Sequence, residues 1–240
     1  MVEINLLDKY PWSKRPIEDR GRRKLPYGGW IIPRSAEVDN TDILIEYRSL
    51  DAAGQFGKEY FDGDRLNGYG GYEYHPRFWT DTVKRFCDYY LLADDASVLD
   101  VGCAKGFMMH DFKKLMPNIT IAGIDISQYA YDLAIEDMKP YITVGNAKCL
   151  PYPDKSFDLV VSINTIDHLP LEECKQALHE IQRVTKTHAF ITVNAWRNDK
   201  ERELLLKWNL TALTYMHVDE WKNLFEEVGY TGDYYWFIPS

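Results

Sequence analysis

The 240-residue sequence predicts an α/β fold in which helices cover both faces of a mostly parallel sheet. Residues 96–238 alternate short apolar runs with longer amphipathic segments, which is typical of parallel strands connected by helices. One apolar run ends in an acidic residue and a glycine-rich turn, a pattern that builds a cofactor site at the carboxyl edge of such a sheet. Residues 1–95 are instead rich in turn-forming and aromatic residues. We therefore expect an N-terminal arm and substrate-facing lid over residues 1–95 and a cofactor-binding core over residues 96–240.

The hydrophobic pattern of the core predicts its elements in order. Short apolar runs predict strands at Ser97–Val101, Thr120–Asp125, Tyr141–Gly145, Phe157–Ile163 and Ala189–Asn194. Amphipathic segments predict helices at Phe107–Met116, Gln128–Met138, Leu171–Val184 and Val218–Val228. Ser127 can cap the second of these helices, and Gly229 is suited to end the last.

Composition excludes several classes of partner. A net charge of −9 and a pI near 5.2 disfavour a protein that binds a phosphate backbone. No apolar stretch approaches the ~20 residues that span a bilayer, and the first residues are too polar for a secretory leader, so we expect a cytoplasmic protein with no membrane contact. The cysteines show no C-x-x-C spacing, which indicates reduced thiols and no metal site. They are Cys87, Cys103, Cys149 and Cys174.

The glycine turn after the first predicted strand indicates which cofactor is bound. Asp100 lies two residues before Gly102, where a dinucleotide would place its pyrophosphate next to the acid. S-adenosylmethionine carries no phosphate, and its sulfonium and ammonium groups are cationic, so Asp100 would be tolerated or attractive. The nicotinamide fingerprint G-x-G-x-x-G is also incomplete, because Gly102, Ala104 and Gly106 have no third glycine in register.

Two further residues suit a bound nucleoside. Asp125 closes the second predicted strand, 19 residues after Gly106, where an acid can accept hydrogen bonds from both ribose hydroxyls. Asp125 could instead only cap the helix that follows Ser127. At the end of the third strand, the side chain of Asn146 and the backbone N–H of Ala147 can read the adenine edge, although Asn is also a common turn residue.

These motifs resemble those of class I S-adenosylmethionine-dependent methyltransferases, in particular the small-molecule type 11 or UbiE-like group. The resemblance is carried, in order, by residues 98–107, 121–127, 145–160, 180–184 and 221–230. It implies a seven-stranded, Rossmann-like sheet, a hairpin after the last helix, and a methyl transfer that leaves S-adenosylhomocysteine. The chain departs from the family pattern at Ala104, which replaces the middle glycine, and at residues 185–188, which replace a glycine turn.

The resemblance also implies roles for single residues. Gly102 and Gly106 let the backbone approach the amino-acid part of the cofactor, and Ile126 covers an adenine face. Because transfer is direct in this family, Cys103 is expected to fill space and not to act as a nucleophile. The expected cofactor-binding residues are Asp100, Gly102, Cys103, Ala104, Gly106, Asp125, Ile126, Asn146, Ala147 and Asn164, with Arg77 for the methionine carboxylate.

Two features of residues 1–95 bear on the substrate. Residues 60–79 combine glycines with many aromatic rings and can form a mobile lid that excludes water, or else a permanent packing layer. A basic arm could hold a phosphorylated acceptor or dock on a second copy of the chain as a homodimer, or simply be solvated. The arm comprises Lys9, Lys14, Arg15, Arg20, Arg22, Arg23 and Lys24.

The expected catalytic residues follow the fourth strand. His168 can accept a proton from an acceptor hydroxyl, and Asp167 beside it can orient the ring. The alternative is a histidine that only supports the loop. Further candidate bases are Tyr72, His75 and His217. An amine acceptor needs no strong base, so the residues leave O- and N-methylation open.

Three functions therefore remain. The motifs favour methyl transfer to a small polar acceptor, and the N-terminal half resembles methyltransferases of bacterial surface-polysaccharide assembly, whose acceptors are nucleotide-activated sugars or related phosphorylated precursors. A nicotinamide-dependent oxidoreductase or epimerase is disfavoured by Asp100 and the missing glycine. A cofactor-binding partner subunit without catalysis would share the same fold.

Overall fold

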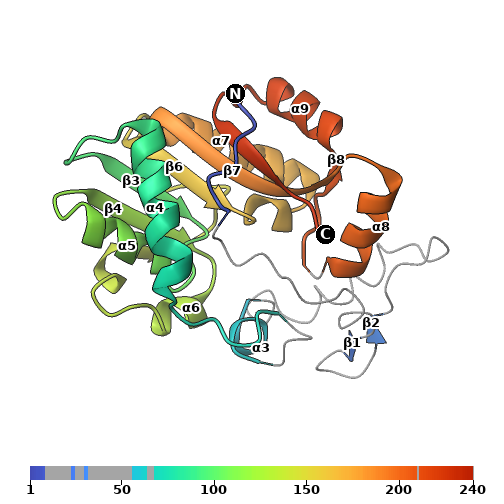
Figure 1. The fold of residues 1–240 in the computed structure, drawn as a ribbon, viewed down its shortest axis with the longest axis horizontal. Coiled ribbons are helices and arrows are strands. Elements are labelled where there is room, and N and C mark those ends of the chain that lie inside the picture. Colours follow the sequence, from blue (N-terminus) through green and yellow to red (C-terminus); the bar gives the residue numbers. More distant parts are fainter. Residues whose placement is uncertain (9–22, 25–29, 32–55, 64–67, 210, 240) are drawn as a thin grey trace.

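Seven strands form one sheet in the computed structural model, which describes residues 1–8, 23–24, 30–31, 56–63, 68–209 and 211–239 (Figure 1). The strand order is β5-β4-β3-β6-β7, and β8 and β9 both pair with β7. The pairings within this sheet are parallel. The strands are β3 (Ser97–Val101), β4 (Thr120–Asp125), β5 (Ile142–Val144), β6 (Phe157–Ile163), β7 (Thr185–Trp196), β8 (Met216–His217) and β9 (Asp233–Phe237).

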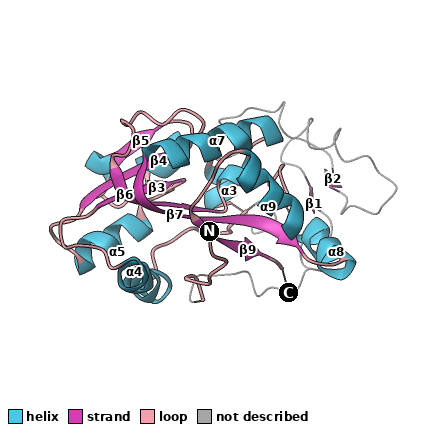
Figure 2. Ribbon diagram, turned by 90° about the horizontal axis from the view of Figure 1, so that it is seen from above, coloured by secondary structure: helices cyan, strands magenta, loops and turns pink. Residues whose placement is uncertain are grey.

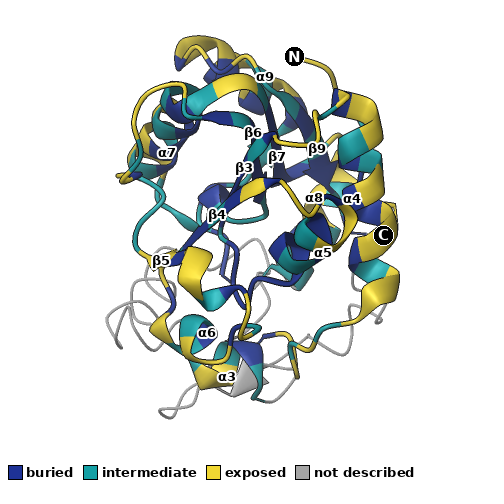
Figure 3. Cartoon of the chain, turned by 90° about the vertical axis from the view of Figure 1, so that its left-hand side faces the viewer, coloured by how far each residue is buried: buried dark blue, intermediate teal, exposed yellow. Residues whose placement is uncertain are grey.

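Helices cover both faces of this sheet. Figure 2 shows α7 and α9 on one side and α4 and α5 on the other, and each pair closes its own apolar cluster against the strands. The strands are largely buried, whereas the outward faces of the helices are exposed (Figure 3). The helices are α3 (Lys58–Phe61), α4 (Pro76–Tyr90), α5 (Phe107–Leu115), α6 (Gln128–Asp132), α7 (Leu171–Val184), α8 (Asp199–Trp208) and α9 (Val218–Glu227), with short 3₁₀ turns η2 (Lys139–Tyr141) and η3 (Ile166–His168).

The predicted fold class and several predicted elements are confirmed. Three predicted strands match β3, β4 and β6, and one predicted helix matches α7. Ser127 caps α6 as expected, since its hydroxyl accepts a hydrogen bond from the Ala130 N–H at 2.9 Å. Gly229, with φ +66°, follows α9.

Other expectations were wrong for identifiable reasons. The helix predicted to reach Met138 ends at Asp132, because the Ile135 N–H bonds to the Lys105 carbonyl at 3.0 Å and not to its own helix. The expected terminal hairpin is absent from the described residues: α9 is a crossover that returns the chain parallel to β7 as strand β9. Pro76–Tyr90, read only as part of an aromatic-rich segment, forms helix α4.

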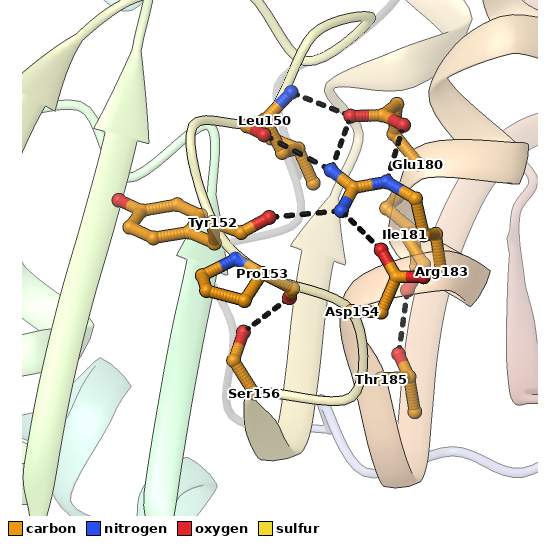
Figure 4. Close-up of polar contacts among 9 residues, drawn as sticks. All are labelled: Leu150, Tyr152, Pro153, Asp154, Ser156, Glu180, Ile181, Arg183 and Thr185. Carbon is orange, nitrogen blue, oxygen red and sulfur yellow. Dashed lines mark hydrogen bonds and ion pairs between the residues drawn. The ribbon is translucent and has the colours of Figure 1, made fainter.

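The absence of a glycine turn before β7 has a direct explanation. Strand β7 begins at Thr185, immediately after the last residue of α7, and the Thr185 hydroxyl bonds to the Ile181 carbonyl at 2.6 Å (Figure 4). The side chain of Arg183 fastens this junction to the loop before β6. It donates to both oxygens of Glu180, to Asp154, and to the carbonyls of Leu150 and Tyr152.

Part of the N-terminal region is packed into the same core as the sheet. Leu6 and Leu7 are buried with α4, α5 and β3 in one apolar cluster, and Phe86 of α4 contacts Phe190 of β7 edge-on at 5.1 Å between ring centroids. Arg23 and Lys24 of the basic arm form a small strand, β1, paired with Trp30–Ile31 (β2). The arm's other residues, and the homodimer contact expected of it, lie outside the described residues.

Two features of the described part of the chain bear on the expected partners. None of its helices is long and apolar enough to cross a membrane. Within the same residues, no group of three or more His, Cys, Asp or Glu side chains is placed to hold a metal ion.

The turn after β3 and the loop after β6 meet at Gly102. Its φ is +87°, and a β-carbon placed there would lie 2.0 Å from the hydroxyl oxygen of Thr165. Only a glycine therefore lets these two loops approach each other, and this approach shapes the carboxyl edge of the sheet.

We expect Gly102→Ala to lower the free energy of unfolding by about 2 kcal/mol or more, because backbone strain of ~1–3 kcal/mol adds to the clash with Thr165. Urea denaturation measures this loss. Gly229→Ala is the matched control, since Gly229 also has positive φ (+66°) but no atom within 4 Å of an added β-carbon. Equal losses in the two variants would show that the clash with Thr165 contributes nothing to the loss of unfolding free energy.

Candidate cofactor and acceptor site

A cavity lies between the carboxyl edge of the sheet and the N-terminal residues 56–63 and 68–79. It encloses about 970 Å³ free of protein atoms, part of it open to solvent. The sheet side brings together most of the expected cofactor-binding residues: Asp100, Gly102, Cys103, Ala104, Asp125, Ile126, Asn146, Ala147 and Asn164. The opposite side, which we call the aromatic wall, consists of Phe56, Tyr60, Phe61, Tyr69, Tyr72 and Trp79.

The glycine turn, residues 102–106, is held against β4. The N–H groups of Gly102 and Cys103 donate to the Ile124 carbonyl, and the Ala104 N–H donates to Asp125 at 2.8 Å. Ala104 adopts φ +47° although it is not glycine, so the departure from the family pattern preserves a left-handed turn. Gly106, with φ +77°, is the N-cap of α5 and is not among the residues that line the cavity.

Of the two acids among the described residues that line the cavity, Asp125 is the one held by hydrogen bonds from the backbone. Its Oδ2 accepts the Ala104 N–H and its Oδ1 accepts the Ser127 N–H, both at 2.8 Å. Burial raises the pKa of this carboxyl, and the two backbone hydrogen bonds oppose that rise. Each oxygen of an ionised carboxylate can accept more than one hydrogen bond, so Asp125 can also accept from a ligand hydroxyl.

Asp100 is buried beside Asp125 at the end of the neighbouring strand. It is 5% exposed, and no described residue donates a hydrogen bond to its carboxyl group. Burial, together with the charge of Asp125, raises the pKa of Asp100 to about 8. A cationic ligand would relieve this cost, whereas an anionic ligand would increase it.

The remaining cofactor candidates have distinct settings. The Asn164 N–H donates to the hydroxyl of Thr192 at 2.9 Å, and this hydroxyl donates to Asn164 Oδ1 at 2.5 Å. The side-chain oxygen of Asn146 accepts the Lys148 N–H at 3.1 Å within its own turn. Burial raises the pKa of the Cys103 thiol well above its usual range, which agrees with a packing role.

Two of the expected catalytic side chains line the cavity. His168 lies at the end of η3, with its ring 5.7 Å from that of Phe56 in an edge-on contact. Tyr72 stacks on Phe107 with 5.0 Å between ring centroids and faces the cavity from the aromatic wall.

The side chain of Asp167 is directed away from this cavity. It is fully buried and accepts hydrogen bonds from the backbone and side-chain nitrogens of Asn194, while its carbonyl accepts from Leu213 and Thr214. The residue therefore joins η3 to β7 and to the segment after α8. No contact of this kind is visible in the sequence, where adjacency to His168 indicated an orienting role.

Three other candidates lie outside the cavity. His75 packs edge-on against Phe78, and the exposed guanidinium of Arg77 lies over the same ring at 4.7 Å. His217 caps α9, because its Nδ1 accepts the Asp219 N–H at 3.2 Å. Arg77 and His75 lie at the start of α4, a helix that was not expected, and so their direction was not predictable.

The aromatic wall is fastened to the core by polar contacts that sequence reasoning missed. The Ser127 hydroxyl donates to the Phe56 carbonyl at 2.5 Å, and the Tyr74 hydroxyl donates to the buried Asp111 at 2.9 Å. Lys105, within the glycine turn, contacts Asp62 of the same N-terminal segment. A lysine inside the glycine turn was the one sequence signal for this attachment.

The fold and the site together define an α/β protein with a cavity at the carboxyl edge of a parallel sheet, the place where sheets of this kind bind their ligands. Residues 98–188 match the family model described as a methyltransferase domain. An uncharacterized methyltransferase of Schizosaccharomyces pombe is 29% identical over 139 residues, which cover 52% of this chain and 49% of that protein. Ajmaline N-methyltransferase of Rauvolfia serpentina is 37% identical over 105 residues, which cover 40% of this chain and 35% of that protein.

A solved structure confirms the fold. The crystal structure of the YcgJ protein from Bacillus subtilis matches with a TM-score of 0.51 and 19% identity, over 61% of this chain and 66% of that one. The chain spans about half the length, or less, of the two curated relatives. Over residues 98–188 the chain is therefore similar to methyltransferase domains, and its fold is the one that the YcgJ structure shows.

Asp100→Asn is expected to stabilise the ligand-free protein increasingly as the pH rises. The pKa of Asp100 is raised from 3.8 to about 8 on folding, so its ionisation opposes folding. The advantage of the variant should grow between these two values by up to ~1.4 kcal/mol per pH unit and be absent below them. Thermal unfolding across this pH range measures it.

Asp158→Asn is the control, because this substitution should change the pH dependence of stability in the opposite direction. Its hydrogen bond with Lys186 lowers the pKa of Asp158 to about 2, so the carboxylate stabilises the fold at neutral pH and loses this effect as the pH falls toward 2. A pH-independent difference between Asp100→Asn and the unsubstituted protein would contradict the assignment of a raised pKa to Asp100.

Proposed function

We propose that this chain transfers a methyl group from S-adenosylmethionine to an oxygen or nitrogen atom of a small acceptor molecule. The observation that carries the proposal is the pair of carboxyls at neighbouring strand ends in one cavity, the buried Asp100 and the half-buried Asp125. This pair suits a cationic nucleoside and opposes the pyrophosphate of a nicotinamide cofactor. The oxidoreductase alternative is therefore not favoured.

The residues of the cavity fit each part of this cofactor. When bound, S-adenosylmethionine supplies a methyl group activated by a sulfonium. Asp125 accepts hydrogen bonds from the ribose hydroxyls, and Asp100 offsets the positive charge of the methionine end. The backbone of the glycine turn and of Asn164 flanks the amino-acid part. Ile126, Asn146 and Ala147 surround the adenine. Arg77, which lies outside the cavity, has no part in this scheme.

The acceptor binds, in this proposal, between the aromatic wall and His168. Aromatic rings exclude water and offer flat surfaces for a ring-shaped molecule, while His168 holds the proton released by a hydroxyl acceptor. Tyr72 is a further candidate base on this side of the cavity. An amine acceptor would need only the aromatic wall and the orientation that it imposes.

A nucleotide-activated sugar, or a related phosphorylated precursor of a bacterial surface polysaccharide, is the specific acceptor that we propose. Its sugar and base rings suit the aromatic wall, and its phosphates would need cations such as those of the basic arm, residues 9–24. A panel of sugar nucleotides, assayed for release of S-adenosylhomocysteine, tests this choice. Turnover only with acceptors that lack phosphate would contradict it.

Asp125→Ala should weaken the binding of S-adenosylmethionine at least tenfold, because two ribose hydroxyls without acceptors cost ~1–3 kcal/mol each in a closed site. Isothermal titration calorimetry measures the affinity. Asp125→Asn serves as a second variant of the same size, and Asp219→Ala, an exposed acid at the start of α9, serves as the control. Unchanged affinity in both Asp125 variants would remove this residue from the ribose role.

His168→Ala should lower kcat by ~100-fold or more with a hydroxyl acceptor, because general-base catalysis typically contributes that much. The affinity for S-adenosylmethionine should not change, since the residue faces the acceptor side. His179→Ala, in the middle of α7 and outside the cavity, is the matched control. A variant that keeps its full rate would leave His168 a structural role and make Tyr72 the next base to test.

A further inference from the structure

Lys105 is a buried lysine within the glycine turn, and every proton of its ammonium has an acceptor. It is 6% exposed, and its Nζ contacts Asp62 Oδ2 at 2.7 Å, Asp62 Oδ1 at 2.9 Å and the Tyr72 carbonyl at 2.9 Å. Burying an ammonium is costly unless it is paired and hydrogen-bonded, so this geometry is held in place by its partners.

Asp62 completes the arrangement from the N-terminal segment. Its Oδ1 also accepts the Tyr72 N–H at 2.9 Å, and its Oδ2 accepts the hydroxyl of Tyr129 at 2.9 Å. Burial raises the pKa of the Asp62 carboxyl, but the hydrogen bonds from Lys105, Tyr72 and Tyr129 outweigh burial and leave the pKa lowered. The Asp62 carboxyl is therefore ionised at neutral pH.

The two residues connect opposite sides of the cavity. Lys105 follows Ala104, whose N–H holds Asp125, and thus belongs to the cofactor side. Asp62 follows α3, and together with Lys105 it binds both backbone polar groups of Tyr72. Tyr72 in turn packs against Tyr69 with 4.5 Å between ring centroids, so the contact positions much of the aromatic wall.

We propose that Lys105 and Asp62 are a positioning pair that holds the aromatic wall closed over the bound cofactor. The inference rests on the proposed function for the identity of that cofactor. Neither residue touches the reacting atoms: both act through Tyr72 and its neighbours. Loss of either partner leaves a buried charge unpaired and frees the wall, so the cofactor product should leave the cavity faster.

The chain contains a matched control of similar chemistry. Arg183 binds Glu180, Asp154 and two carbonyls at the junction of α7 and β7, and the residues drawn there lie outside the cavity lining (Figure 4). Arg183→Met removes an equally dense set of charged hydrogen bonds. It should lower stability without opening the wall.

The test measures the dissociation rate of S-adenosylhomocysteine by stopped-flow fluorescence, with Trp79 of the aromatic wall as a reporter. Lys105→Met and Asp62→Asn should each accelerate dissociation about tenfold or more, as expected for hydrogen bonds to charged groups. The double variant should be no faster than the faster single variant, because the two side chains act as one unit. Arg183→Met should dissociate at the unsubstituted rate.

Hydrogen exchange on the ligand-free protein provides a second readout that is independent of the cofactor. Exchange over residues 56–63 and 68–74 should accelerate in Lys105→Met and in the milder Asp62→Asn, and not in Arg183→Met. Unchanged exchange and dissociation in the first two variants, or equal acceleration in the third, would overturn the positioning role. Failure of the unsubstituted protein to bind S-adenosylhomocysteine would instead count against the proposed function, and the exchange experiment would still decide the role of the pair.

Discussion

The parallel pairing of β3 with β4 is the constraint on which the site depends. Val101 lies opposite Ile124 in this ladder, so the acids Asp100 and Asp125 come to the same edge of the sheet. The turn after β3 then bonds back to β4 through Gly102, Cys103 and Ala104, and its backbone becomes part of the cavity. Every other wall of the cavity is built around these two strand ends.

The electrostatics of the cavity depend on which of its charged side chains have hydrogen-bond or ion-pair partners. Asp100 has no described hydrogen-bond donor, while Asp125 is held by two backbone N–H groups. Lys105, the nearest lysine in sequence, is fully engaged by Asp62 and Tyr72 and does not neutralise either acid. With its pKa raised to about 8, Asp100 is mostly protonated at neutral pH in the ligand-free protein. A cationic ligand would favour its ionised form, whereas the phosphates of a dinucleotide would oppose it.

The described part of the N-terminal region has two structural roles. Leu7 and helix α4 belong to the apolar cluster that covers one face of the sheet. The segment before α4 carries the aromatic wall except for Trp79, which belongs to α4 itself, and Ser127 and Lys105 fasten this segment at the carboxyl edge. One stretch of chain thus contributes both to the core and to the closure of the site, so we propose that the division near residue 95 separates functions and not folding units.

The sequence by itself determined the fold class, the bounds of β3, β4, β6 and α7, and many of the residues of the sheet-side cavity wall. Each of these depends on local pattern: apolar runs, a glycine turn, and acids at strand ends, whose positions follow once the strands are parallel. The tertiary structure decided what depends on contacts between distant segments. It ended α6 early through the carbonyl of Lys105, it turned Asp167 inward toward Asn194, and it placed Arg77 on the outer side of α4. It also joined Lys105 to Asp62, 43 residues away. Such a contact was not predictable, because its energy depends on burial and on distant partners that no local sequence pattern encodes.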